Sequence, residues 1–101
     1  MSYPITSPDK GVTRQVLAEN PDLMVVAFGF QTGAEGKLHN HPHVQSTFVE
    51  SGRFRFHMDG TDHDLSAGDS LIIPSNVTHG CICLEAGRLI DTFTPRRDDF
   101  L

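Results

Sequence analysis

The chain has 101 residues, of which 38% are hydrophobic, and a formal net charge of -5 at pH 7. This length suits one domain around one core and leaves no room for a second, so we assign residues 1–101 to a single domain. Eight Lys and Arg residues against thirteen Asp and Glu residues argue against a surface that follows phosphates, so nucleic acid is not an expected partner. No apolar run is long enough to span a bilayer, and the N-terminal residues lack a basic region followed by an apolar one. We therefore expect a soluble, cytoplasmic protein with no membrane partner.

Short extended segments alternate with turn residues along the first part of the chain. Residues 1–11 are polar and contain Pro and Gly, which predicts an N-terminal arm. Strands are predicted at Thr13–Leu17 and at Leu23–Phe30, an apolar run too short for a buried helix. A further extended segment begins at Leu38 and is interrupted by Pro42, as an edge or bulge proline would interrupt it.

The second part of the chain continues the same pattern. Asp59-Gly60 is a hairpin signal, and the tail 94–101 is polar. No stretch shows a sustained helical period, so the fold is predicted to be an all-β sandwich or barrel. The strands predicted here are Val44–Glu50, Arg53–Met58, a segment around His63–Leu65, Leu71–Ile73, His79–Leu84 and Arg88–Phe93.

Four histidines in two blocks of the sequence could form a metal site. His39 and His41 stand at alternate positions, which on a strand point the same way, and His43 continues the pattern. Gln45 has the same parity and could offer a carbonyl oxygen, while His79 would arrive from a distant strand. The spacing alone does not distinguish such a site from surface histidines, and it does not separate His43 from the other two.

The two cysteines, Cys81 and Cys83, are interpreted as reduced. On a strand their side chains point to the same face, which is a poor geometry for bridging each other.

The two histidine blocks resemble the two motifs of the cupin superfamily. The first is Gly33, five residues, His39-x-His41, three residues, Gln45, six residues and Gly52, with Gln in the place that Glu usually takes. The second is Gly68, five residues, Pro74 and then His79, with Asn76 where the motif has Gly and Cys83 where it often has Asn. The resemblance implies a small single-domain jelly-roll barrel, the double-stranded β-helix. It also implies one divalent metal ion, whether Ni, Zn, Mn, Fe or Co, held by His39, His41, Gln45 and His79, with His43 beside the site.

Within this superfamily the chain is similar to the KdgF type, small proteins of pectin and alginate breakdown. The similar segments include Thr13–Leu17, His39–Gln45, Ile73–Val77 and Leu89–Pro95, and they continue through Asp99–Leu101. General cupin patterns do not extend into this last segment.

The resemblance implies a reaction and residues for it. The reaction is the metal-dependent conversion of a 4,5-unsaturated uronate, a small anionic sugar, into a linear 4-deoxy-5-keto uronate. The implied acid/base residue is Asp91, which interrupts an apolar strand, and Phe93 would be an apolar wall for the sugar ring. Arg14 is the first candidate to bind the substrate carboxylate, with Arg96 and Arg97 as alternatives in an exposed tail.

Two other functions remain open on the sequence. One is a cupin dioxygenase that acts on a small molecule through bound iron. The other is a non-catalytic cupin that senses sugar or stores metal. Because small cupins usually pair through their terminal strands, we also expect a homodimer.

Overall fold

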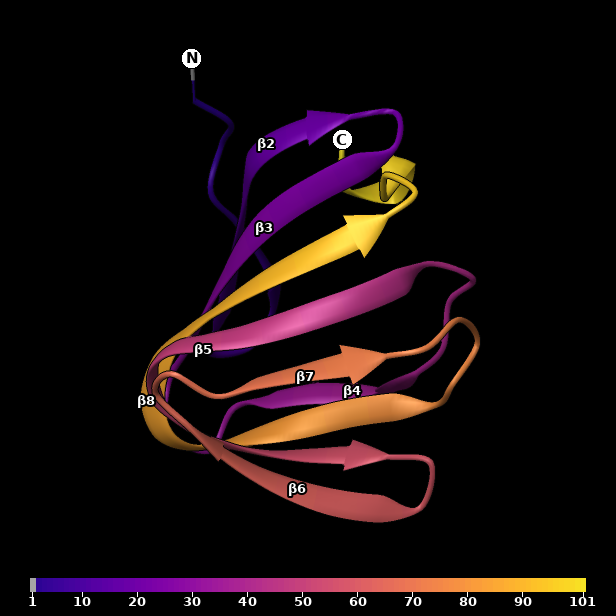
Figure 1. Ribbon diagram of the computed structural model, residues 1–101. Coiled ribbons are helices and arrows are strands. Elements are labelled where there is room, and N and C mark those ends of the chain that lie inside the picture. Colours follow the sequence, from indigo (N-terminus) through magenta and orange to yellow (C-terminus); the bar gives the residue numbers. More distant parts are fainter. Residues whose placement is uncertain (1) are drawn as a thin grey trace.

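The computed structural model describes residues 2–101, and in this range it contains strands and one short 3-10 helix (Figure 1). The prediction of an all-β fold is confirmed. No helix among these residues is long and apolar enough to cross a bilayer. The elements are β1 (Thr6–Asp9), β2 (Val12–Asn20), β3 (Leu23–Phe30), β4 (Glu35–His39), β5 (Val44–Met58), β6 (Thr61–Ser66), β7 (Ser70–Ile73), β8 (His79–Thr94) and η1 (Asp98–Phe100).

The strands form one antiparallel sheet that is folded on itself. Its order is β1-β2-β3-β8-β5-β6, while β4 pairs with β8 and β7 pairs with β5. Asp59 and Gly60 both have positive φ, of 50° and 79°, and connect the register pair Met58 and Thr61, which confirms the predicted hairpin.

The strands β5 and β8 are each continuous where the sequence analysis predicts two strands. The predicted breaks at Ser51-Gly52 and Glu85-Ala86-Gly87 are wrong, because the two strands pair there through shifted registers and bend without ending. Gly52 has a φ of 80°, and a Cβ on Gly87 would lie 2.0 Å from the carbonyl oxygen of Ser51. Figure 1 shows both strands turning at the same side of the molecule, at the left of the view, so that each runs through both layers of the folded sheet.

Two groups of buried side chains occupy the interior. The first includes Phe54, Phe56, Val49 and Leu89, and it lies where β5 and β8 bend. The second consists of Val16, Met24, Val26 and Phe93, with Phe28 and Phe100 packed against it. The interior between the layers is therefore apolar and aromatic on both sides of the bend.

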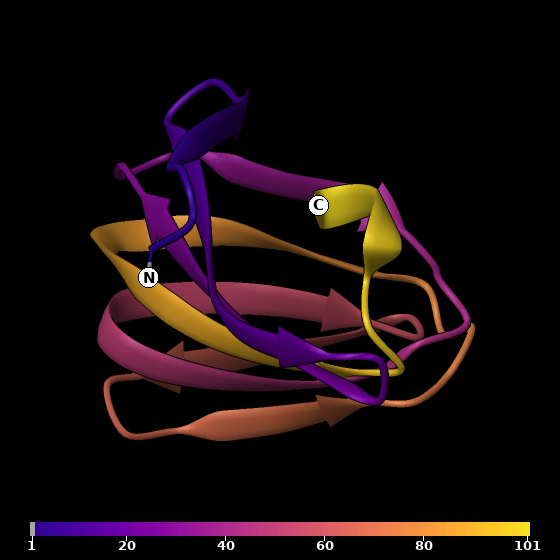
Figure 2. The same ribbon diagram turned by 90° about the horizontal axis from the view of Figure 1, so that it is seen from above.

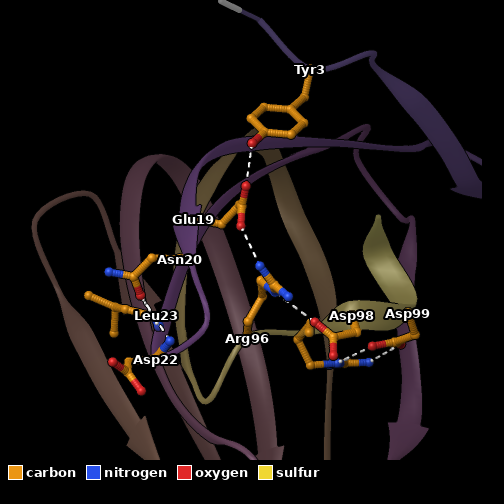
Figure 3. A network of polar contacts seen from close by, with 9 residues as sticks. Tyr3, Glu19, Asn20, Asp22, Leu23, Arg96, Asp98 and Asp99 are labelled. Atoms are coloured by element: carbon orange, nitrogen blue, oxygen red, sulfur yellow. Dashed lines mark hydrogen bonds and ion pairs between the residues drawn. The ribbon is translucent and has the colours of Figure 1, made fainter.

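Both ends of the described chain are attached to the sheet. Within the predicted N-terminal arm, β1 pairs with β2, and the hydroxyl of Tyr3 donates a hydrogen bond to Glu19 on β2. Glu19 in turn accepts a hydrogen bond of 2.8 Å from Arg96 in the tail, and Arg96 also donates to Asp98, as Figure 3 shows. Figure 2 shows the yellow C-terminal turn folded back over the strands.

Candidate functional site: a histidine cluster in an aromatic cavity

Three of the predicted histidines come together from separate elements. His39 ends β4, His41 lies in the loop that follows, and His79 begins β8 as the register partner of His39. One ring nitrogen of each lies within 4.8 Å of those of the other two. His41 and His79 are buried, whereas His39 is exposed, so the cluster is accessible from one side. The sequence predicts all three because each belongs to a spaced motif.

Backbone carbonyls orient all three imidazoles in the same way. The Nδ1 atoms lie 2.7, 3.0 and 2.9 Å from the carbonyl oxygens of Lys37, His43 and Val77. A carbonyl only accepts, so each Nδ1 carries the hydrogen and each Nε2 keeps a lone pair. The Nε2 of His79 is buried and has no hydrogen-bond partner among residues 2–101. This tautomer is the one in which an imidazole binds a metal ion through Nε2.

Burial also keeps two of these rings neutral. Desolvation lowers the pKa of His79 to about 4, and desolvation lowers the pKa of His41 as well. Because a metal ligand must be deprotonated, neutral imidazoles at pH 7 suit the site to a divalent ion.

Gln45 presents its carbonyl oxygen to the cluster. Its Nε2 donates hydrogen bonds to Thr47 Oγ1 (3.0 Å) and Asp91 Oδ2 (3.2 Å), which fixes the orientation of the amide. Its Oε1 then lies 3.0 Å from His41 Nε2. Two ligands at right angles on one ion, each at about 2.1 Å, are separated by about 3 Å. The three histidines could therefore hold a metal ion, and the Gln45 oxygen lies at such a separation from one of them, His41.

His43 lies next to the cluster without joining it. Its ring centroid is 5.5 Å from that of His41, and its carbonyl oxygen accepts the hydrogen bond from His41 Nδ1. Strand parity alone does not separate it from the other histidines. The strand ends at His39, so from Asn40 onward side chains no longer alternate between two faces, and parity does not predict where His43 points.

Asp91 is a buried carboxylate in the middle of β8. It is the register partner of Thr47 on β5, and the residue is 5% exposed. Desolvation raises the pKa of Asp91 to about 7, and a hydrogen bond with Thr47 acts in the opposite direction. Its Oδ1 has no hydrogen-bond partner in the described range 2–101. Asp91 is thus linked to the histidine cluster through Gln45 and keeps one oxygen unbound.

A cavity of about 310 Å³ connects the histidine cluster with aromatic and basic side chains. Its wall combines the aromatic side chains of Phe28, Phe30, Phe56 and Phe93 with polar and charged ones of both signs, a mixture that a small polar molecule can use for packing and orientation. Cys81 also faces it, and burial raises the pKa of this thiol to about 12, which keeps it protonated. Both cysteines are free, as the sequence predicts. The predicted site residues that line this cavity are His39, Gln45, His79, Asp91, Phe93 and Arg14.

Arg97 also lines the cavity, and its expected place in an exposed tail is wrong. Its side chain is 12% exposed and its guanidinium carbon lies 5.2 Å from the centroid of Phe93. Arg96, the other alternative, pairs instead with Glu19 and Asp98. The sequence offers Arg97 as an alternative carboxylate ligand but does not place it in the cavity, because the return of the tail depends on contacts with distant strands. The available signal was Phe100, an aromatic residue in an otherwise polar tail.

Comparisons with known proteins agree with this architecture. A family model described as a cupin domain matches residues 26–93. The pectin degradation protein KdgF of Dickeya dadantii (strain 3937) is 40% identical over 93 residues, which cover 90% of this chain and 84% of that protein. The crystal structure of an RmlC-like cupin from Shewanella frigidimarina is 43% identical with a TM-score of 0.94, and the match covers 98% of this chain and 89% of that chain. The structure of KdgF from a Halomonas species is 38% identical with a TM-score of 0.93, and the match covers 98% of this chain and 92% of that one. The chain therefore belongs to the cupin superfamily and, within it, to the KdgF group.

Proposed function

We propose that this protein is an enzyme that converts 4,5-unsaturated uronate monosaccharides, released by lysis of pectin or alginate, into linear 4-deoxy-5-keto uronates. Two relatives carry the name KdgF, and one of them is described as a pectin degradation protein. The observation that carries the proposal is the carboxylate of Asp91, joined through Gln45 to the histidine cluster beside one cavity. An acid/base group next to ligands for a Lewis acid suits a reaction that moves protons on an oxygen-rich substrate.

The basic and aromatic lining of the cavity suits a uronate. Arg14 and Arg97 would bind the substrate carboxylate, because guanidinium groups match the geometry of a carboxylate. Phe93 would pack against the apolar side of the sugar ring. These three residues therefore account for both the charge and the shape of the substrate.

His39, His41, Gln45 and His79 would hold one divalent ion. Three neutral imidazoles and an amide oxygen accept Ni, Zn, Mn, Fe or Co, with the choice set by availability as well as affinity. When bound, such an ion supplies a Lewis acid for the carboxylate of the substrate and an adjacent oxygen. The ligand set is neutral, so it leaves the positive charge of the ion available to an anionic substrate.

The proposed role of Asp91 is to move the protons of an isomerisation. A proton leaves the anomeric hydroxyl, the bond between C1 and the ring oxygen breaks, and an enol forms at C5. The enol becomes a ketone as C4 gains a proton, so atoms and electrons balance without oxygen or another reactant. Gln45 holds one oxygen of Asp91, which leaves Oδ1 to accept and return the proton.

Proton NMR of the product distinguishes this function from the two alternatives. Metal-loaded protein is mixed with fresh 4,5-unsaturated galacturonate without oxygen, and the vinyl H-4 signal is followed against the spontaneous reaction. We expect accelerated loss of this signal, no oxygen consumption in a parallel aerobic sample, and loss of the acceleration in Asp91→Asn. Oxygen consumption would favour the dioxygenase, and the absence of turnover would favour the sensing or storage cupin.

We also propose that the enzyme acts in the cytoplasm. Cys81 and Cys83 are both free, and cysteines without a disulfide suit a reducing compartment.

A further inference from the structure

Phe100 brings the tail into the wall of the cavity. It belongs to η1 and lines the cavity beside Arg14 and Arg97. Its ring packs edge-on against Phe28 and Phe93, with centroids 6.1 and 5.7 Å away. Two aromatic neighbours in this geometry give the ring a defined orientation. The ring is thus a fixed part of the wall, although it comes from a segment outside the sheet.

Two guanidinium groups stack on this one ring. The guanidinium carbon of Arg14 lies 4.1 Å from the centroid of Phe100, and that of Arg97 lies 4.2 Å from it. Both distances are within the reach of a cation–π contact, which extends to about 6 Å. Arg14 comes from β2 and Arg97 from the tail, so Phe100 is the group that the two cations share.

The charges around the ring do not balance. Arg97 donates two hydrogen bonds to Asp99, of 3.0 and 2.8 Å. For Arg14, the described residues 2–101 provide no salt bridge. Around Phe100, two cations therefore have one close carboxylate between them, a local excess of positive charge that suits an anion, while Asp9, Glu35 and Asp91 also line the cavity.

The ring also depends on the network that fixes the tail. Arg96 is the neighbour of Arg97 in sequence, and it is paired with Glu19 of β2, as Figure 3 shows. The backbone N–H of Arg96 further donates to the carbonyl of Pro21. These contacts hold the tail against the β2–β3 hairpin, where Phe100 can reach Arg14.

We propose that Phe100 is a positioning residue for substrate binding, whose ring holds Arg14 and Arg97 together so that both guanidinium groups bind the carboxylate of a uronate. This inference rests on the proposed function for the identity of the ligand. Phe100 would contribute no polar atom to the substrate site and would act through Arg14 and Arg97. The ring fixes their side chains before the anion arrives, and this lowers the ordering cost of binding.

The test measures binding of D-galacturonate, a saturated uronate that lacks the reacting double bond, to the metal-loaded protein by calorimetry. Phe100→Ala is expected to weaken binding by about tenfold. Phe100→Leu keeps most of the apolar volume without an aromatic face, and we expect a similar loss, whereas Phe100→Trp retains binding. Leu101→Ala is the matched control, because Leu101 is adjacent and exposed and does not line the cavity. Thermal unfolding of each variant verifies that it is folded.

A double-mutant cycle tests whether Phe100 acts through Arg97. In an Arg97→Ala background, Phe100→Ala should cause a clearly smaller loss than in the wild type, because the shared interaction is already broken. Wild-type binding in Phe100→Leu, additive losses in the cycle, or no galacturonate binding by the wild type would each overturn the inference. Binding without turnover of the unsaturated sugar would overturn the proposed function alone.

Discussion

Gln45 connects two functional groups through the two ends of one amide. Its oxygen faces the histidine cluster, and its nitrogen donates to Asp91 and Thr47. A glutamate at this position would keep an oxygen ligand but would lose the donor toward Asp91. The glutamine therefore permits the Asp91 carboxylate next to the proposed metal ligands, because it adds no negative charge of its own there.

We predict that Gln45→Glu retains metal and loses turnover. The new carboxylate can still bind a divalent ion, but it replaces a hydrogen-bond donor 3.2 Å from Asp91 with a like charge. Turnover of the unsaturated uronate should fall by on the order of 100-fold, the scale of one acid/base contribution. Metal content and kcat measured on the same sample test this. Gln31→Glu, at an exposed glutamine that does not line the cavity, is the control, and unchanged kcat in Gln45→Glu would contradict the prediction.

His79→Ala is predicted to release the metal. His79 supplies a buried Nε2 that already has the tautomer for coordination. Outer partners of ligands alone contribute about 10- to 100-fold to metal affinity, so loss of a ligand should cost on the order of 100-fold or more. Competition with a chromogenic chelator measures this, with His43→Ala as the control at a neighbouring histidine outside the cluster. Equal metal affinity in both variants would mean that the ligands are wrongly assigned.

At the residue scale, the sequence predicts side chains that belong to spaced motifs more readily than those placed by tertiary contacts. The histidines and Gln45 are close in sequence or carry a recognisable spacing, and Asp91 is notable as a carboxylate in an apolar strand. Arg97 carries no such mark. Its guanidinium reaches the cavity because Arg96 pairs with Glu19 of β2 and returns the tail to the sheet, and no local pattern in the sequence indicates that contact.

At the scale of elements, the bend that the paired strands β5 and β8 share determines where the site can form. Both strands bend at opposing glycines, Gly52 and Gly87, whose backbones approach too closely for a side chain. The sequence marks these positions as breaks, because Ser-Gly and Ala-Gly are turn signals. They are bulges instead, since each strand has a partner that continues past the glycine. The bend lets β8 provide His79 at one end and Asp91 near the other.

Gly87→Ala is therefore predicted to destabilise the fold. Its Cβ would lie 2.0 Å from the carbonyl oxygen of Ser51, so the two strands must separate locally, at a cost of about 3 kcal/mol. For a domain of this size the midpoint of thermal unfolding should fall by roughly 15 °C. Gly33→Ala is the control, because that Cβ would meet no atom of residues 2–101 within 4 Å and only the positive φ opposes it, at about 1 kcal/mol. Equal midpoints of thermal unfolding for the two variants would mean that the close approach of β5 and β8 at Gly87 does not limit stability.

At the scale of the whole molecule, the outer face of the sheet has a patch without charged side chains, which lies on β5 and β7. On β5, Val44, Ser46 and Phe48 alternate with the cavity-side residues, so they point away from the cavity, and Ile72 of β7 is the register partner of Ser46. Phe48 is 44% exposed and Ile72 is 59% exposed. Because this face carries no charge at these positions, it can meet a second copy of itself without repulsion, even though each chain has a net charge of -5.

We predict that the homodimer uses this face of β5 and β7, and not the terminal strands expected from the sequence, because the exposed Phe48 and Ile72 lie here. Light scattering is expected to give twice the mass of one chain for the wild type and the mass of one chain for Ile72→Glu, because the new charge would be buried unpaired at the contact. His63→Glu, on β6 at the edge of the sheet, should leave the dimer intact. A monomeric wild type would show that the predicted homodimer does not form, and a dimeric Ile72→Glu variant would mean that the contact lies on another face.

The most direct test of the proposed ring-opening activity is the decay of the ultraviolet absorbance of the unsaturated bond when metal-loaded protein is mixed with fresh 4,5-unsaturated galacturonate. Spontaneous ring opening is subtracted, and chelated and anaerobic samples are measured alongside. We predict a decay that requires the metal, persists without oxygen, and slows to near the spontaneous rate in Asp91→Asn. A decay no faster than the spontaneous one, with metal present in the protein, would mean that the protein does not catalyse this ring opening.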